Sequence, residues 1–286
     1  MIRRTTVAGQ FYPSKRAELV TQIEGFLEEE KEEKTENEEK RIFGAIVPHA
    51  GYTYSGQAAA SVYSNIAGID SDTIVILGPN HTGIGKNIAL SLQHFDTPLG
   101  IVKTDTEFVN ELISAGFEQD ERAHEYEHSI EVQLPFLQHI FEKAKKPEKL
   151  RIVTAVLSCS FEECKKFAEA IANATAKLQK KIFILASSDF THYGAAYGFT
   201  PFTSDVKKQL YALDKKAISY IEKMDSKKFF EASGKTTICG AVPISVAIES
   251  CKALGAKKGE LLKYYTSGEI TGDYNTAVGY AGIVFV

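Results

Sequence analysis

Histidines stand in three loops that follow predicted strands, where side chains could hold a metal ion or move protons. His49 and His81 each come shortly after a run of apolar residues, and a third such run precedes Asp189 and His192. Imidazoles are common ligands of zinc, copper and iron, and they are the usual acid–base groups of enzymes. In open α/β sheets, ligands bind outside the carboxyl ends of the strands. We therefore expect His49, His81 and His192 to converge on one pocket.

A fourth loop adds a thiol to this set. Cys239 precedes a predicted helix for which Pro243 is a plausible first-turn residue. The positive end of a helix dipole, or a bound cation, lowers a thiol pKa and favours the thiolate that binds metal or attacks substrates. The other three cysteines are expected to be reduced packing residues, since the chain has no CxxC pair; they are Cys159, Cys164 and Cys251.

Other catalytic patterns fit poorly. Residues 124–128 read HEYEH, which matches the HExxH zinc motif, but the apolar helical periodicity starts only at Ile130. Ser129 is therefore the expected helix cap, and both histidines would precede the helix or fray from it. The glycine-rich stretch 78–86 lacks the Gly-Lys-Ser/Thr order of a phosphate-binding loop, and no GxSxG nucleophile elbow occurs. A zinc protease, a P-loop enzyme and a serine hydrolase are thus disfavoured.

Alternating strands and helices are expected to position these loops. Short β-branched runs alternate with amphipathic segments of helical period, which predicts a single largely parallel or mixed sheet between helical layers. The predicted strands are 42–47, 73–77, 87–92, 151–157, 181–186, 261–267 and 276–286. The predicted helices are 14–30, 55–67, 105–115, 129–141, 160–179, 204–223 and 243–254.

Composition bounds the kind of protein. The 286 residues are 44% hydrophobic and 24% charged, as in globular proteins, and we predict one domain over residues 1–286. Residues 28–41 lack any large hydrophobic side chain and are expected to be solvent-exposed. The net charge of −4, without a long basic run, argues against nucleic acid as a partner. No apolar stretch is long enough for a membrane span or a signal peptide, so we expect a cytoplasmic protein.

Six motifs in order resemble the Memo family (mediator of cell motility; AmmeMemoRadiSam system protein B). They are Arg3 with AGQFYP at 8–13, PHAGYTYSG at 48–56, GPNH at 78–81, EHSIEVQLP at 127–135, SSDFTHYG at 187–194, and Cys239-Gly240. The resemblance spans nearly the whole chain. It implies a three-layer α/β/α sandwich like that of class III extradiol dioxygenases of the LigB type, with a mixed central sheet.

The resemblance also implies roles for particular residues. His49 and His81 match the two histidines that bind non-haem iron in those dioxygenases, Cys239 takes the place of the carboxylate ligand, and His192 matches the acid–base position. Asp189 belongs to the same motif. A thiolate is softer and a stronger electron donor than a carboxylate, so ring cleavage need not carry over. The implied cofactor is a divalent metal, iron or copper, with zinc as an alternative.

Three functions fit these residues. The first is a metal-dependent redox protein, related to dioxygenases, that acts on an unidentified small molecule or peptide. The second is a catalytically inactive module that binds a ligand or peptide in the same pocket. The third is a metal-free cysteine hydrolase or transferase, with Cys239 as nucleophile, His192 as base and Asp189 orienting it. The residues expected to line the pocket are Tyr52, Tyr54, Asn80, His128, Ser188 and Tyr193.

Overall fold

A mixed sheet of ten strands forms the centre of the computed structural model, which describes residues 1–33 and 40–286. Its order is β10-β12-β2-β9-β3-β8-β4-β7, with β11 paired to β12 and β6 to β8, and β1 and β5 form a separate two-stranded sheet. The strands are β1 (Ile2–Arg3), β2 (Gly44–Val47), β3 (Thr73–Pro79), β4 (Ile88–Leu90), β5 (His94–Phe95), β6 (Lys103–Thr104), β7 (Glu118–Gln119), β8 (Arg151–Leu157), β9 (Ile182–Ser187), β10 (His192–Gly194), β11 (Gly259–Thr266) and β12 (Thr276–Phe285).

The four central strands, β2, β9, β3 and β8, run parallel, and β12 and β4 join them antiparallel on either side. The register pairs Val47 with Ser187 and Leu77 with Ala186. The carboxyl ends of β2, β9 and β3 therefore lie at one edge of the sheet, and the loops that follow them start side by side.

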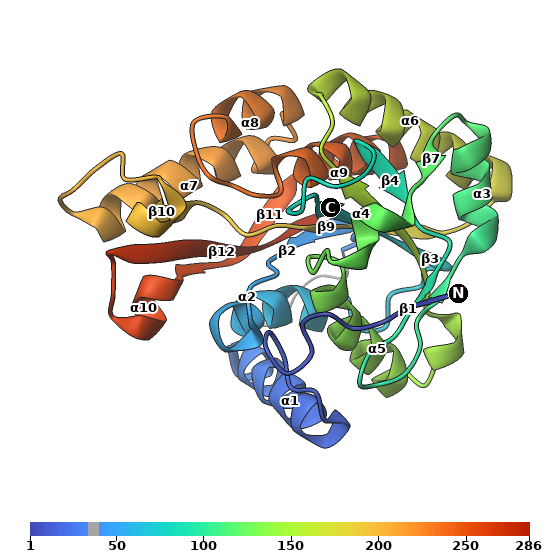
Figure 1. Cartoon of the computed structure of the whole chain (residues 1–286), viewed down its shortest axis with the longest axis horizontal. Helices are drawn as coiled ribbons and strands as arrows, with labels where there is room; N and C mark the ends of the chain where they lie inside the picture. The colour runs from blue at the N-terminus through green and yellow to red at the C-terminus, as the bar shows by residue number, and fades with distance from the viewer. Residues whose placement is uncertain (34–39) are drawn as a thin grey trace.

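Helices cover both faces of this sheet. In Figure 1, α1, α2 and α5 lie below the sheet, and α6, α8 and α9 lie above it. The predicted three-layer α/β/α arrangement, with a mixed and largely parallel sheet, is confirmed. The helices are α1 (Arg16–Glu33), α2 (Tyr52–Asn65), α3 (Thr106–Ser114), α4 (Glu121–Glu125), α5 (Leu134–Lys143), α6 (Phe161–Leu178), α7 (Val206–Glu222), α8 (Ser226–Ser233), α9 (Ala241–Leu254) and α10 (Ser267–Thr271).

The side chains of strand β3 pack against the helices on both faces of the sheet. Successive side chains of a strand point to opposite faces, so a strand between two helical layers must be apolar at every position. Ile74 and Ile76 pack into the core between the sheet and α1, α2 and α5. Val75 and Leu77 pack into the core on the other face, between the sheet and α3, α6 and α9. All four side chains are buried.

The segment around Ser129 differs from the prediction of a helix over 129–141. A 3-10 turn at Glu131–Gln133 precedes α5, which begins only at Leu134. Ser129 is not the cap, because its hydroxyl has no hydrogen-bond partner among the described residues. The short helices α4, α8 and α10 were not predicted, and α4 places His124 on a helix rather than before one.

The charged run at 28–41 is only partly exposed. Glu28, Glu29, Lys40 and Arg41 are exposed, as expected. Glu30 is buried and forms an ion pair with Lys263 at 2.6 Å, so the prediction of exposure is wrong there. For residues 31–39, the prediction falls outside the side chains that the structure describes.

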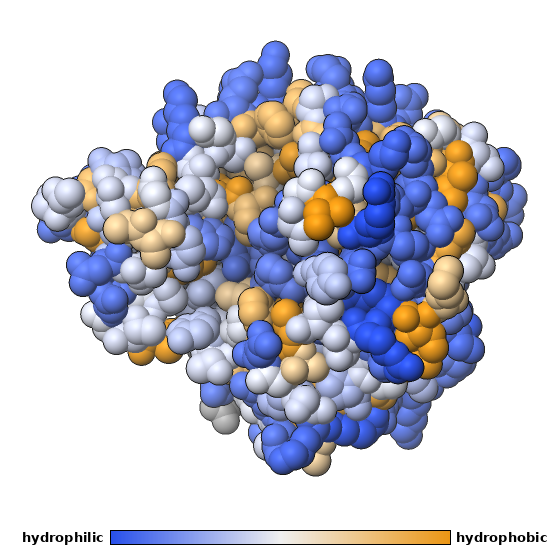
Figure 2. Space-filling view, in the orientation of Figure 1, coloured by the Kyte–Doolittle hydropathy of each residue, from blue (hydrophilic) through white to orange (hydrophobic). Residues whose placement is uncertain are grey.

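The face in Figure 2 is largely hydrophilic, with apolar residues scattered over it. Scattered apolar side chains are normal on the surface of a globular protein. Within residues 1–33 and 40–286, no helix combines the length and the apolar character that crossing a membrane requires.

Candidate metal centre

His49 and His81 follow the aligned strand ends with the same spacing. His49 comes two residues after β2, and His81 comes two residues after β3, which continues to Pro79. The neighbouring strand β9 ends at Ser187 and leads directly to Asp189. The register of the central strands therefore brings these loops together.

His49, His81 and Cys239 bring one ligand atom each into a common space. Their ligand atoms all lie within 4.8 Å of one another. The Sγ of Cys239 is 3.3 Å from Nε2 of His49, and the rings of His49 and His81 meet edge to face with centroids 5.1 Å apart. His49 is buried, whereas the side chain of His81 is 33% exposed, so the cluster is open to solvent on the His81 side.

Glu127 holds His81 from behind. Its carboxylate accepts hydrogen bonds from Nδ1 of His81 at 2.9 Å, from the His81 backbone N–H at 2.8 Å and from the Ser129 N–H at 2.9 Å. Burial opposes ionisation, but the hydrogen bond and charge of His81 outweigh it and lower the pKa of Glu127 to about 2. The partnership raises the pKa of His81 in spite of that ring's burial. The Nε2 atom of His81 is left for another ligand, and a carboxylate behind a histidine is typical of metal sites.

His49 is held by Ser187. Its Nδ1 lies 3.0 Å from the Ser187 hydroxyl, and its backbone N–H donates to Asp189 at 2.8 Å. Burial, together with the nearby rings of His81 and His128, lowers the pKa of His49 well below its ordinary value. The imidazole is therefore neutral near pH 7, which is the form that binds a metal.

Cys239 lies just before helix α9, as predicted, but its pKa moves in the opposite direction from the prediction. Burial and the neighbouring Asp189 carboxylate raise the pKa of the thiol well above its ordinary value. These effects exceed the hydrogen bond that the Asp189 N–H donates to the sulfur at 3.3 Å. Cys239 is therefore a neutral thiol. It becomes a thiolate where a bound cation balances the negative charge.

Gly240 lets Cys239 approach strand β9. A Cβ at this position would overlap the Ser188 side chain and lie 3.0 Å from the Ser187 carbonyl oxygen. The Gly240 N–H also donates to the Ser188 hydroxyl at 3.0 Å. The loop that carries Cys239 can therefore reach His49 only with glycine here.

We expect Gly240→Ala to lower the free energy of unfolding by about 1–3 kcal/mol, as overpacking does, and to weaken any metal bound at Cys239. Gly234→Ala is the matched control, because its new Cβ would meet only the Glu231 carbonyl oxygen, at 3.6 Å. Urea unfolding of both variants measures the difference. Equal stabilities would contradict the close approach at Gly240.

Asp189 and His192 lie beside the cluster with different roles. The Oδ1 atom of Asp189 accepts from the backbone N–H groups of His49 and Ala50, at 2.8 and 3.3 Å, and so clamps the His49 loop. Nδ1 of His192 lies 3.0 Å from the Thr237 carbonyl oxygen, which can only accept, so Nδ1 carries the proton and Nε2 is the basic nitrogen. Asp189 thus positions backbone, while His192 can accept a proton.

Asp214 of α7 supports the same loop from the core. Its carboxylate accepts from the Thr191 hydroxyl and backbone N–H and from the Tyr264 hydroxyl, the last at 2.7 Å. Burial raises the pKa of Asp214 from 3.8 to about 6. The neutral carboxyl group of Asp214 therefore contributes fully to stability below its unfolded-state pKa. This contribution is lost as the pH rises through 6.

We expect wild type to lose about 2 kcal/mol of unfolding free energy relative to Asp214→Asn between pH 4 and pH 7. Asparagine does not ionise, so the difference between the two proteins isolates the cost of charging this carboxyl group. Urea titrations at several pH values measure it. Parallel stability curves for the two proteins would contradict the assignment.

His128 completes a ring of three imidazoles. Its ring stacks on that of His81 with centroids 4.7 Å apart and meets that of His49 edge-on at 5.4 Å. Burial lowers the pKa of His128 to about 4, so it is neutral near pH 7. With Glu127 and His81 it forms a second group of closely spaced donor atoms. The oxygens of Glu127 already accept three hydrogen bonds, so this group is better explained as support for His81.

The other residues predicted to line the pocket differ in where they lie. Ser188 lies near the cluster, with its hydroxyl 4.0 Å from the sulfur of Cys239. Tyr54 is 43% exposed. Asn80 serves the turn after β3, because its carbonyl oxygen accepts from Thr82 and Gly83.

Tyr52 and Tyr193 pack into the core instead of facing the cluster. Tyr52 is 1% exposed, lies between Tyr12 and Phe136, and donates its hydroxyl to the Val132 carbonyl oxygen at 2.8 Å. Tyr193 stacks on Phe202 and donates its hydroxyl to that residue's carbonyl oxygen.

The HExxH motif at 124–128 does not form a site. His124 is buried in α4, and its Nε2 lies 2.8 Å from the Ala89 carbonyl oxygen. His128 faces the other histidines. Sequence reasoning missed Glu127 as the partner of His81, although it lies within this motif. It also missed the roles of Gln133 and Ser187, although both lie within the motifs at 127–135 and 187–194.

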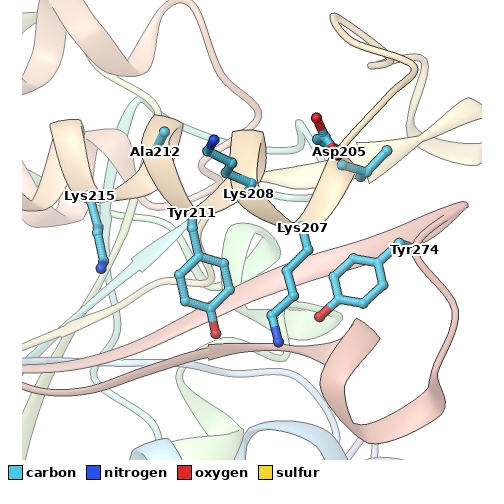
Figure 3. A pocket seen from close by; sticks show the side chains of 8 residues that line it. Asp205, Lys207, Lys208, Tyr211, Ala212, Lys215 and Tyr274 are labelled. Atoms are coloured by element: carbon cyan, nitrogen blue, oxygen red, sulfur yellow. The ribbon is translucent and has the colours of Figure 1, made fainter.

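A cavity away from the cluster lies beside α7. It measures about 780 Å³, and Figure 3 shows Lys207, Tyr211, Lys215 and Tyr274 around it. Lys207 forms an ion pair with Glu269 at 3.3 Å, and the Tyr211 hydroxyl also bonds to Glu269, so these polar groups are already paired. None of the predicted site residues lines this cavity.

The fold and the sequence have known relatives. A solved structure of an uncharacterized protein from Escherichia coli K12 has a similar fold, with a TM-score of 0.52 and 12% identity over 86% of this chain and all of that one. The pattern of the family described as Memo-like protein matches residues 3–284. MEMO1 family proteins of Methanosarcina barkeri and Nitrosopumilus maritimus are 39% and 38% identical, and each alignment covers at least 99% of both chains. The chain belongs to the Memo family.

Proposed function

We propose that this Memo-family protein holds one iron or copper ion on His49, His81 and Cys239 and uses it in oxidation–reduction chemistry on a small molecule or peptide. The observation that carries the proposal is the convergence of two imidazole nitrogens and one sulfur within 4.8 Å. Two nitrogens and a thiolate suit iron, copper and zinc. Bound iron or copper would supply the one-electron and oxygen chemistry that side chains lack.

The surrounding residues support this use. Glu127 and Ser187 hold the far nitrogens of His81 and His49, as second-layer groups do in metal sites. The exposed side of His81 gives a substrate access to the cluster. The basic Nε2 of His192 can take a proton from a substrate.

Two other functions have less support. A metal-free cysteine hydrolase needs a reactive thiolate, whereas burial and Asp189 raise the pKa of Cys239, and the nearest imidazole nitrogen is that of His49 rather than His192. A ligand-binding module was expected to use Tyr52, Tyr54 and Tyr193. The hydroxyls of Tyr52 and Tyr193 are committed to backbone carbonyls, which leaves the exposed Tyr54 for a ligand.

Metal analysis after anaerobic purification tests the proposal. We expect about one equivalent of iron or copper in wild type and in His192→Ala, and almost none in a His49→Ala, His81→Ala double variant. If the double variant does not fold, His81→Ala alone is a milder change at an exposed side chain and should also lose metal. Stoichiometric metal in a folded double variant would end the proposal.

A further inference from the structure

The hydrogen bonds behind His49 determine which of its ring nitrogens carries the proton. The Ser187 hydroxyl has one proton and lies 2.7 Å from the Ser129 carbonyl oxygen, which can only accept. Two acceptors cannot approach so closely without a proton between them, so Ser187 donates to Ser129. Its oxygen then accepts from Gln133 Nε2 at 2.8 Å and from Nδ1 of His49 at 3.0 Å. His49 must therefore be protonated on Nδ1.

The orientation of the Gln133 amide follows from the same reasoning. Its nitrogen lies 2.9 Å from the Pro48 carbonyl oxygen, and its oxygen accepts from the Tyr63 hydroxyl at 2.8 Å. A flipped amide would set two acceptor oxygens against each other at Pro48. The amide nitrogen therefore faces Ser187 and cannot accept a proton from it.

Burial makes this network rigid. Ser187 and Tyr63 are fully buried, and Gln133 is 1% exposed. Each polar hydrogen in the chain Tyr63–Gln133–Ser187 meets an acceptor, and an unpaired group in such a place costs about 1–3 kcal/mol. Bulk water does not reach these side chains.

We infer that Ser187, held by Gln133 and Tyr63, is a positioning residue that keeps His49 protonated on Nδ1 and leaves Nε2 with a free lone pair toward the sulfur of Cys239. That lone pair lies 3.3 Å from the sulfur, on the side where the three ligand atoms meet. The placement of the proton rests on the hydrogen bonds alone. Its consequence, a His49 nitrogen prepared for metal, rests on the proposed function.

Nitrogen NMR of the metal-free protein tests the proton placement directly. With ¹⁵N-labelled histidine, we expect the His49 Nδ1 resonance at the shift of an N–H nitrogen and Nε2 at that of an unprotonated nitrogen. In Ser187→Ala the acceptor is gone, so we expect the tautomer to change or to become mixed. Ser187→Thr, which keeps the hydroxyl, should restore the wild-type pattern.

Ser250→Ala is the matched control. Ser250 is a fully buried serine of α9 whose hydroxyl has no partner in the described part of the chain, and its loss should leave the His49 resonances unchanged. A wild-type His49 protonated on Nε2 would overturn the inference even if Ser187→Ala did not fold. An unchanged tautomer in folded Ser187→Ala would overturn it as well.

Anaerobic titration with Fe(II) against a competing chelator tests the consequence. We expect Ser187→Ala to bind Fe(II) about 10- to 100-fold more weakly than wild type, as loss of a supporting hydrogen bond does in other metal sites, and Ser250→Ala to bind like wild type. Wild-type affinity in Ser187→Ala would overturn the positioning role. If wild type binds neither iron nor copper, the proposed function fails while the NMR result still judges the tautomer.

Discussion

Replacing Arg3 with methionine is expected to lower the free energy of unfolding by about 3–5 kcal/mol, the usual cost of removing one partner of a buried ion pair. Arg3 is 4% exposed and pairs with Glu131, which is fully buried. The guanidinium also donates to the carbonyl oxygens of His124 at 3.1 Å and Glu127 at 2.6 Å. Methionine keeps much of the apolar packing, so the loss would report the charge and its hydrogen bonds.

The neighbouring Arg4 is the control for this prediction. Its side chain is 78% exposed and pairs with Asp96 at 2.8 Å on the surface. Exposed ion pairs contribute about 0–1 kcal/mol, so Arg4→Met should unfold close to wild type. Urea unfolding of both variants provides the measurement. A loss below about 1 kcal/mol in Arg3→Met would contradict the account of the buried pair.

Glu127→Gln is expected to weaken metal binding about 10- to 100-fold. The carboxylate accepts three hydrogen bonds, from Nδ1 and the backbone N–H of His81 and from the Ser129 N–H. An amide has only one oxygen, so its NH₂ group must face one of these donors. One oxygen accepts from Nδ1 of His81 and the Ser129 N–H, and the other accepts from the His81 backbone N–H, so either orientation of the amide leaves a donor of His81 unpaired and holds His81 less firmly.

Glu125→Gln separates this effect from a general change of charge. Glu125 lies two residues earlier and is exposed, so its replacement should change neither stability nor metal affinity. Chelator competition with Fe(II) under anaerobic conditions measures all three proteins. If Glu127→Gln lost stability but kept wild-type affinity, the supporting role of Glu127 at His81 would be contradicted.

The sequence predicted the meeting of distant loops because that follows from general rules of α/β sheets. Apolar runs located the strands, and the strand-end rule then selected His49, His81 and the 187–194 loop. These residues do gather at one edge of the sheet. Cys239 was found by its place before a helix, and its sulfur lies 3.3 Å from Nε2 of His49.

The groups that support the site could not be predicted in this way. Gln133 reaches Ser187 across 54 residues, and Glu127 reaches His81 across 46, and no local pattern records such pairs. The pKa of Cys239 was predicted in the wrong direction because the helix dipole can be inferred from sequence, whereas burial and the Asp189 carboxylate cannot.

Tyrosine and glutamate illustrate the same limit. A tyrosine in a loop motif can face a pocket or fill the core, and Tyr52 and Tyr193 do the latter. Glu30 lies in a run of charges that reads as solvated, yet it is buried beside Lys263, with which it forms an ion pair. The sequence pattern predicts which face of a helix or strand is buried, but individual contacts decide whether a polar residue is exposed.

X-ray absorption spectroscopy of the anaerobically iron-loaded protein tests the central claim most directly. We predict one sulfur scatterer and nitrogen scatterers typical of two imidazoles in wild type, with the sulfur absent from Cys239→Ser. An iron environment without sulfur in wild type, or one that Cys239→Ser leaves unchanged, would contradict a metal centre built on His49, His81 and Cys239.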